Sequence, residues 1–471
     1  MPVLVGATTR SAFGWAAAVV IAAAIAWLTR HGGTGVLITG FVFSSAFVTS
    51  GLVTEPTHYM PVAVTGGALA LRVALDFRTH GLGPRPPLPI LVTVGLYLAW
   101  AALATLTSID RRTSAVYAVG MVAVCGLAFW VIPNTLAARQ DRERFLASLG
   151  ALGVVVALTV DFVSVAGGFK VFGRLVGFYQ VVDLTLGGHA TGLHFGYSSG
   201  AYLTPGEPSV LMAIGIIALL GWSAARSGSG LLLSWAGIVF MIPAVLLTLD
   251  RSAQLAAGVG AGAFVAMAAV GKLRIAQATF VFLFFTIVFL LVFADVVGAN
   301  QLGPAGCTSN CSSAREGAGI RGGGSLSGRE YLWTASWDAI KHKPILGYGP
   351  GNDVAAIDPY LSKLSVPKIY ALGGLTSHST WFRTAVEMGI PGLLFLLGTG
   401  LAVAWVFVRR AREARALPDA TQIALAAAVI GLLPAMTFET FLLGGVTFGS
   451  LFLTVAAGLA IGPFKPQPAG A

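Results

Sequence analysis

Long apolar runs recur from one end of this chain to the other, and they constrain its fold more than any other feature. Each run holds about 17–25 residues, which is the length a helix needs to cross a hydrocarbon core of roughly 30 Å. Backbone amides find no water in that core, so single runs of this kind are expected to be helical. The runs lie at 12–28, 36–52, 58–77, 87–108, 114–134, 145–168, 209–225, 230–249, 252–271, 277–298, 388–408, 420–437 and 445–462.

The composition agrees with this pattern. The chain is 56% hydrophobic and 10% charged, whereas about a quarter of the residues in an average soluble domain are charged. We therefore predict an all-α fold, a polytopic transmembrane helical bundle of about 12–13 spans. The first run is not expected to be a cleaved signal peptide, because further spans follow it and no small-x-small cleavage site is evident.

The net charge of +10 indicates orientation in the membrane, and no nucleic-acid partner is expected. Basic residues gather in short connections between spans, as is typical of cytoplasmic turns. This pattern places two long connections, 169–208 and 299–387, on the outer face. The number of spans and the orientation of the amino-terminal end stay open, since thirteen spans put Arg111 and Arg112 outside. The basic residues that mark the cytoplasmic turns are Arg78, Arg85, Arg139, Arg142, Arg144, Lys272, Arg274, Arg409, Arg410, Arg412 and Arg415.

Three parts of the chain follow from this topology. Residues 1–298 are expected to hold transmembrane helices with the outer loop 169–208. Residues 299–387 form a large extracytoplasmic loop, and residues 388–471 form the carboxy-terminal transmembrane helices and a short tail.

Cysteine and metal-ligand patterns are sparse. Cys125 lies in a span, where a buried inert thiol is expected. Cys307 and Cys311 share the large loop, and whether they form a disulfide stays open. No Asp-x-Asp or His-Glu-x-x-His spacing is present, so we predict no metal and no cofactor.

The large loop carries the residues best suited to chemistry. Apolar residues at helical spacing over 329–340 predict a short amphipathic helix on the membrane surface. Basic residues and Pro344 are expected to end this helix. Gly347, Gly349 and Gly351 then permit a tight turn.

A second polar cluster begins at His378. The residues after it predict a helix, and the positive end of that helix favours a neutral imidazole. Nine residues further on, Glu387-Met388-Gly389-Ile390-Pro391-Gly392 leads into the span at 388–408. Nine residues correspond to roughly 900° of helical rotation, so Glu387 is not expected to orient His378. We assign Glu387, Gly389 and Gly392 structural roles at a helix junction.

These motifs, taken together and in this order, resemble the O-antigen ligase and O-antigen polymerase family of membrane glycosyltransferases. The resemblance rests on Arg329 four residues before Trp333, the turn His342–Asn352, and His378 ahead of Glu387-x-Gly389-x-x-Gly392. It implies a GT-C-like bundle in the bacterial cytoplasmic membrane with an extracytoplasmic active site. It also implies transfer of a glycan from a polyprenyl-diphosphate donor to a glycan, lipid or protein acceptor, without a metal.

The resemblance suggests roles for several residues. His378 would act as general base, and Arg251 and Arg329 would bind the donor diphosphate. Arg251 alternatively lies at the interface with its charge directed toward water. His189 stands where members of the family carry an arginine, and Arg174 is a possible substitute.

Three further residues are candidates for contacts with the acceptor. Glu207 either binds an acceptor sugar or favours the start of a helix through its charge. Trp333 and Asn352 lie within the motif of the large loop and are candidates there.

These residue types fit glycosyl transfer from a diphosphate. The leaving group gains negative charge, which guanidinium groups can stabilise. A base on the opposite side of the sugar would accept the proton of the attacking hydroxyl and invert the anomeric centre. A transporter of lipid-linked glycans is the alternative class, and the related peptidoglycan-polymerising membrane family ranks below it. Ligase and polymerase share these motifs, so the sequence leaves acceptor, donor sugar and oligomeric state open.

Overall fold

The computed structural model describes residues 34–45, 60–81, 83–166, 169–171, 174–176, 179–186, 189–198, 206–224, 227–248, 250–270, 297–301, 329–364, 376–413, 419–445 and 447–462. The span predicted at 12–28 lies outside these residues, as does the span predicted at 277–298 apart from its last two residues. Cys307 and Cys311 also lie outside them.

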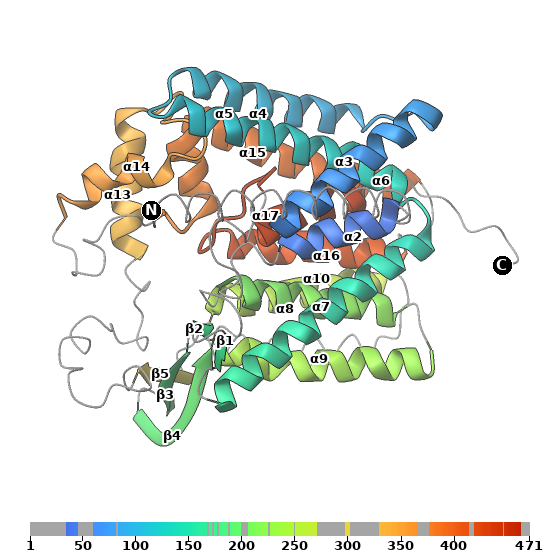
Figure 1. Ribbon diagram of the computed structural model, residues 1–471, viewed down its shortest axis with the longest axis vertical. Helices are drawn as coiled ribbons and strands as arrows, with labels where there is room; N and C mark the ends of the chain where they lie inside the picture. The colour runs from blue at the N-terminus through green and yellow to red at the C-terminus, as the bar shows by residue number, and fades with distance from the viewer. Residues whose placement is uncertain are drawn as a thin grey trace, which may run out of the picture.

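Apolar helices make up the body of the protein (Figure 1). Every other predicted span coincides with such a helix where its residues are described. Among the described residues, six helices are long and apolar enough to cross a membrane. The protein is thus an integral-membrane helical bundle, as the sequence predicts. Its helices are α2 (Thr34–Ser45), α3 (Met60–His80), α4 (Leu88–Leu106), α5 (Arg111–Gly126), the π-helical turn η2 (Leu127–Val131), α6 (Ile132–Thr135), α7 (Arg139–Ala166), α8 (Gly206–Ser223), α9 (Ser229–Leu247), α10 (Arg251–Val270), α15 (Thr380–Glu413), α16 (Ala420–Ala435) and α17 (Phe448–Ala460).

Helix α8 forms the centre of the bundle, where nearly all of its residues are buried. It packs against α7, α9, α10 and α16. Small residues make the approach close: a Cβ atom on Gly215 would lie 3.1 Å from the Cα atom of Gly153 on α7. Lipid offers little hydrophobic drive for association between helices, so such close backbone packing stabilises the bundle.

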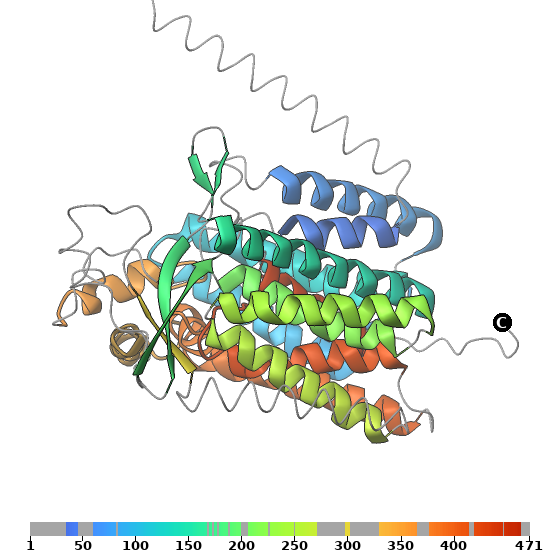
Figure 2. The same ribbon diagram turned by 90° about the horizontal axis from the view of Figure 1, so that it is seen from below.

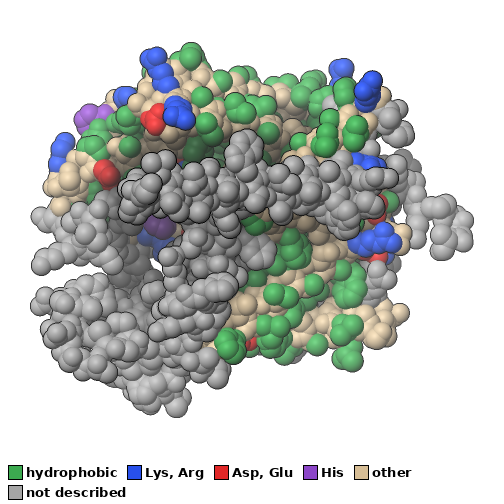
Figure 3. All heavy atoms as spheres, viewed as in Figure 1, with side chains coloured by type: hydrophobic (Ala, Val, Ile, Leu, Met, Phe, Trp, Pro, Cys, Tyr) green, Lys and Arg blue, Asp and Glu red, His purple; other side chains and the backbone are tan. Residues whose placement is uncertain are grey.

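The basic turns gather at one end of the bundle, which we call the basic end. Arg142 at the start of α7 pairs with Asp419 at the start of α16, with 2.7 Å between Nη2 and Oδ2. Arg410 near the end of α15 donates to the carbonyl of Gly462, beyond α17. Figure 3 shows hydrophobic side chains over the middle of one face and charged side chains mostly toward its two ends. This distribution fits helices that cross a bilayer.

Two small antiparallel sheets lie at the opposite end, which the sequence analysis did not predict (Figures 1 and 2). One consists of β1 (Phe169–Val171) and β2 (Arg174–Val176). The other has the order β4-β3-β5, with β3 (Tyr179–Leu186), β4 (His189–Ser198) and β5 (Val297–Gln301). The predicted outer loop 169–208 therefore contains strands. The β-branched residues of β3 and the Gly187-Gly188 pair before β4 are typical of a hairpin.

The large loop folds back onto α15. Helix α13 (Arg329–His342) crosses the end of the bundle, and α14 (Asp353–Leu361) packs against it (Figure 1). Leu332, Ala335, Ala339 and Ile340 form the buried face of α13. The predicted amphipathic helix is thus confirmed, and it ends at His342 as expected.

The predicted junction lies at Gly389, where α15 is kinked. Gly389 has φ of +69°, outside helical values. Ile390 donates its amide to the carbonyl of Pro344 at 2.8 Å, which brings the turn after α13 against the kink. Gly347, Gly349 and Gly351 also have positive φ, so the predicted tight turn is confirmed.

Replacing Gly389 by alanine is expected to destabilise the protein by at least about 2 kcal/mol. The added Cβ would overlap the Ile345 carbonyl, and the positive φ is unfavourable for any L side chain. Thermal unfolding in detergent measures the effect. Gly398→Ala is the matched control, because nothing lies within 4 Å of a Cβ at that position of the same helix. Equal stability of the two variants would contradict the packing described at the kink.

Candidate functional site

An ion pair at the end of the bundle opposite the basic end joins two distant parts of the chain. Arg329, the first residue of α13, lies with its Nη2 atom 3.2 Å from Oε1 of Glu439. Glu439 lies in the turn between α16 and α17. About a quarter of the Arg329 side chain is exposed (26%), and 21% of Glu439 is exposed. The pair is therefore shielded by protein yet open on one side.

Two further acidic residues stand around Glu439. Asp250 precedes α10 and accepts hydrogen bonds from the amide (3.0 Å) and hydroxyl (2.6 Å) of Ser252. It also accepts from the hydroxyl of Ser209 on α8, so it ties the starts of α8 and α10 together. A Cβ on Gly206 would lie 3.5 Å from both Glu439 carboxyl oxygens. Glu207, next to Gly206, is thus brought to the same place.

The environment of Glu439 favours its protonated form. Burial, together with the nearby carboxylates of Asp250 and Glu207, raises the pKa of Glu439 to about 8, although Arg329 opposes the shift. Near neutral pH, Glu439 can therefore hold a proton or release it in response to a nearby charge.

His378 lies close to Arg329 at this end of the bundle. Its backbone has φ of +46°, and it is the only residue other than glycine with positive φ among the described residues. Such a conformation persists only where neighbouring contacts enforce it. Burial, together with the charge of Arg329, lowers the pKa of His378 to about 4. The imidazole is therefore neutral at physiological pH, as the sequence analysis expected, although burial rather than the helix end is the main cause.

Hydrogen bonds on both sides hold the His378 backbone in place. On one side, Asp353 of α14 accepts from the amide (2.8 Å) and hydroxyl (3.1 Å) of Ser377. On the other, the Thr380 amide and hydroxyl donate to the Glu439 carbonyl at 3.1 and 2.9 Å. The same hydroxyl accepts from the Phe441 amide at 2.8 Å. His378 is thus fixed against the residue that pairs with Arg329.

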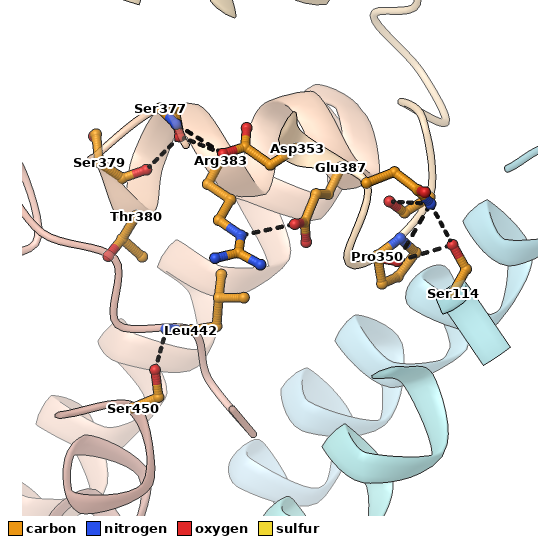
Figure 4. A network of polar contacts seen from close by, with 12 residues as sticks. Ser114, Pro350, Asp353, Ser377, Ser379, Thr380, Arg383, Glu387, Leu442 and Ser450 are labelled. Carbon is orange, nitrogen blue, oxygen red and sulfur yellow. Dashed lines mark hydrogen bonds and ion pairs between the residues drawn. The ribbon is translucent and has the colours of Figure 1, made fainter. Parts of the chain in front are cut away.

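Glu387 serves a different partner. It forms a buried ion pair with Arg383, one helical turn earlier, with 2.7 Å between Oε1 and Nε. Figure 4 shows this pair between Asp353 and Ser377 on one side and Ser114 and Pro350 on the other. The Glu387 carbonyl accepts from the Gly349 amide at 2.8 Å. These contacts fit the structural role expected of Glu387, and no contact orients His378 through it.

Gly392, the other structural candidate, packs against Trp100. A Cβ at this position would lie 3.5 Å from Cδ1 of Trp100 on α4. The indole Nε1 of Trp100 donates to the Met388 carbonyl at 2.8 Å. A Cβ at Gly392 would also lie 2.4 Å from the Cβ atom of Met388, so glycine at this position leaves room for Met388 at the kink.

Trp333 lies on the same face of α13 as Arg329. Its ring stacks on Phe382, with 5.8 Å between ring centroids, and lies 6.1 Å from Phe438, the neighbour of Glu439. Its buried Nε1 atom has no hydrogen-bond partner among the described residues. Trp333 therefore forms an aromatic wall beside the Arg329–Glu439 pair.

Asn352 belongs to the packing of the glycine turn. Its amide Nδ2 donates to the hydroxyls of Ser108 and Ser114, each at 2.8 Å. The side chain is buried and thereby joins this turn to α5 and to the connection before it. The side-chain Nδ2 of Asn352 is therefore already hydrogen-bonded within the protein.

The remaining candidates lie at the same end but are less closely defined. Arg251 is the first residue of α10, directly after Asp250. Arg174 begins β2, and His189 begins β4, where it pairs with Leu186 across the hairpin. Within the described residues, no three His, Cys, Asp or Glu side chains are grouped to hold a metal ion.

Sequence reasoning missed Glu439, Asp353 and Arg383. Glu439 is a lone charge in a short turn between two apolar segments, and that isolation was the available signal. Asp353 and Arg383 flank the motifs that were singled out, but their partnership depends on how the loop folds back.

Comparison with protein families finds a match over part of the chain. Residues 236–397 match the family model described as O-antigen ligase. A comparison with curated proteins finds no match for the chain. The matched segment includes Arg251, Arg329 and His378, whereas Glu207 and Glu439 lie outside it.

The protein is expected to lose thermal stability as pH rises from about 5 to about 8, and Glu439 contributes to this loss. The pKa of Glu439 rises from an ordinary 4.5 to about 8 in the folded protein. The proton on Glu439 therefore contributes its full stabilisation of the folded protein below the ordinary pKa of 4.5. This contribution is lost as the pH rises through the folded-state pKa of about 8. Glu439→Gln removes the titration, so its melting temperature should depend less on pH. An unchanged pH profile in Glu439→Gln would contradict this environment.

Proposed function

We propose that this chain, of which residues 236–397 match the O-antigen ligase family model, transfers a glycan from a polyprenyl diphosphate to a hydroxyl acceptor. The reaction would take place on the extracytoplasmic side of the bacterial cytoplasmic membrane. It would need no metal and would invert the anomeric configuration. Residues 299–387 would be the extracytoplasmic loop between two sets of transmembrane helices, 1–298 and 388–471.

One observation carries this proposal. A guanidinium group, a neutral imidazole and a carboxyl group meet at the end of a membrane bundle opposite its basic turns. A polyprenyl donor places its diphosphate near the membrane surface, where groups at the end of the bundle can reach it. The positive-inside rule makes the basic end cytoplasmic, so the site would face outward.

In the proposed step one bond breaks, another forms, and one proton moves to His378. The bond between the anomeric carbon and the donor oxygen breaks, and its electron pair stays on the diphosphate. The acceptor oxygen bonds to that carbon from the opposite side while His378 accepts the hydroxyl proton. Arg329 stabilises the charge on the leaving diphosphate through paired hydrogen bonds.

The low pKa of His378 fits a base that is activated by its substrate. Without donor, the positive charge of Arg329 helps to keep the pKa of His378 at about 4. The negative diphosphate would offset that charge and so strengthen the imidazole as a base. Glu439, paired with Arg329, would position the guanidinium and adjust its own protonation as the donor binds.

Other residues would complete the donor and acceptor sites. Arg251 would add to diphosphate binding. Arg174 would do the same, in the role of the family arginine whose position His189 occupies in this chain. Glu207 and Trp333 would border the acceptor, whereas Asn352 would act through the glycine turn it holds. The acceptor would be lipid A core, a growing glycan, a protein or another wall polymer.

His378→Ala is expected to reduce transfer at least about 100-fold, as loss of a general base does, while lipid-linked donor still binds. A reconstituted transfer assay and a separate donor-binding assay measure the two effects. His80→Ala, at the end of α3, is the matched control and should keep full activity. Full turnover by His378→Ala would remove the proposed base.

Arg329→Ala is expected to weaken donor binding about tenfold or more, because a charged, two-point contact with phosphate is lost. The donor affinity of Arg329→Lys should lie between those of Arg329→Ala and the unmodified protein, since lysine keeps the charge but lacks the planar guanidinium. Arg144→Ala, an exposed arginine at the basic end, serves as control. Unchanged donor affinity in Arg329→Ala would exclude the diphosphate contact.

Deletion of the gene separates ligase from polymerase. Loss of a polymerase should leave single repeat units on the lipid carrier. Loss of a ligase should leave full-length glycan without its anchor. An envelope unchanged in both respects would contradict either activity.

A further inference from the structure

A second cluster of basic and aromatic side chains lies at the other end of α13, away from Arg329. The hydroxyls of Tyr348 and Tyr360 lie 3.0 Å apart. The Lys343 Nζ atom lies 4.7 Å from the centre of the Tyr348 ring, and Lys363 Nζ lies 5.3 Å from that of Tyr360. The His342 ring lies 5.0 Å from the Tyr360 ring. Two lysine ammonium groups and one histidine ring thus lie around this tyrosine pair.

These two lysines have no carboxylate partner among the described residues. The nearby Lys341 differs, because its Nζ atom lies 2.6 Å from Oδ1 of Asp338. Lys343 and Lys363 therefore leave positive charge at this surface that an anion can neutralise.

Two exposed apolar side chains lie on the segment that carries Lys343. Ile345 is 62% exposed, and Trp337 on α13 is 53% exposed. Ile345 follows Pro344, whose carbonyl accepts from the amide of Ile390 at the kink of α15. From there, exposed apolar residues continue along α15 at helical spacing: Ile390, Leu394, Leu397, Leu401, Trp405 and Val408.

This stripe sets the level of the basic cluster relative to the membrane. From Ile390 to Val408 the helix advances 18 residues, or about 27 Å at 1.5 Å per residue, close to the thickness of a hydrocarbon core. Ile390 then lies near one boundary of the hydrocarbon, and Ile345 lies beside it. Lys343, just after α13, and Lys363, just beyond the end of α14, then lie near the level of the lipid headgroups.

We propose that Lys343 and Lys363, which lie over the rings of Tyr348 and Tyr360, bind the headgroup phosphate of an anionic phospholipid. Ile345 and Trp337 would contact the upper part of its acyl chains. The lipid belongs to the leaflet at the α13 end of the bundle. Because α13 is one rigid helix of 14 residues, a lipid held at its end would also fix the depth of Arg329 at its start, a consequence that rests on the proposed function.

Lipid binding to the purified full-length protein tests this site. Native mass spectrometry counts phosphatidylglycerol and phosphatidylcholine molecules retained at equal concentration. Phosphatidylglycerol should be preferred, and Lys343→Gln or Lys363→Gln should each weaken its binding about fivefold. Lys341→Gln is the matched control on the same helix and should keep the preference.

The outcomes separate the possible ligands. Equal retention of the two lipids, or an equal loss in Lys341→Gln, would overturn the proposal. Displacement of the lipid by low concentrations of inorganic phosphate would show a site for free phosphate instead. None of these results depends on transfer activity, so they stand apart from the test of His378.

A spin label tests the apolar side of the site independently. Ile345→Cys, in a chain with Cys307→Ser and Cys311→Ser, carries the label in bilayers containing phosphatidylglycerol. The label should collide more often with oxygen than with a water-soluble nickel complex. Greater access to the nickel complex would place Ile345 in water and overturn the membrane contact.

Discussion

Hydrogen bonds between Thr380 and the turn after α16 hold the site together. They join the segment that carries His378 to Glu439, and Glu439 in turn pairs with Arg329. Three parts of the chain separated by tens of residues thereby meet at one end of the bundle. The loop 329–364 also contacts the transmembrane helices at the kink of α15 and, through Asn352, near the start of α5.

Buried charges in this region are arranged in compensated groups. Arg383 and Glu387 neutralise each other inside the protein, and Oδ2 of Asp353 accepts two hydrogen bonds from Ser377. The Arg329 group differs, because three carboxylates, Glu439, Asp250 and Glu207, gather near one guanidinium. Burial and this crowding raise the pKa of Glu439, so proton uptake can balance the local charge. A site that can change its charge by one proton is suited to binding an anion and releasing it.

Sequence reasoning predicted the elements whose signals are local. The apolar spans, the amphipathic helix at 329–342, the glycine turn and the junction at Gly389 each depend on short-range pattern or backbone conformation. The structure contains each of them wherever it describes the residues concerned. Strands β3 and β4 were not predicted because only helical periodicity was expected in a membrane protein. Glu439 was missed because its importance lies in a contact with Arg329, 110 residues away. No local pattern encodes such a contact.

The central claim is that Arg329 and His378 act on one donor molecule from opposite sides. A cryo-EM structure with a non-hydrolysable polyprenyl-diphosphate sugar tests it most directly. If both residues act as proposed, phosphate oxygens lie within hydrogen-bond distance of the Arg329 guanidinium, and the His378 imidazole faces the anomeric carbon on the side away from the diphosphate. A diphosphate bound elsewhere, or an imidazole on the same side as the leaving group, would contradict it.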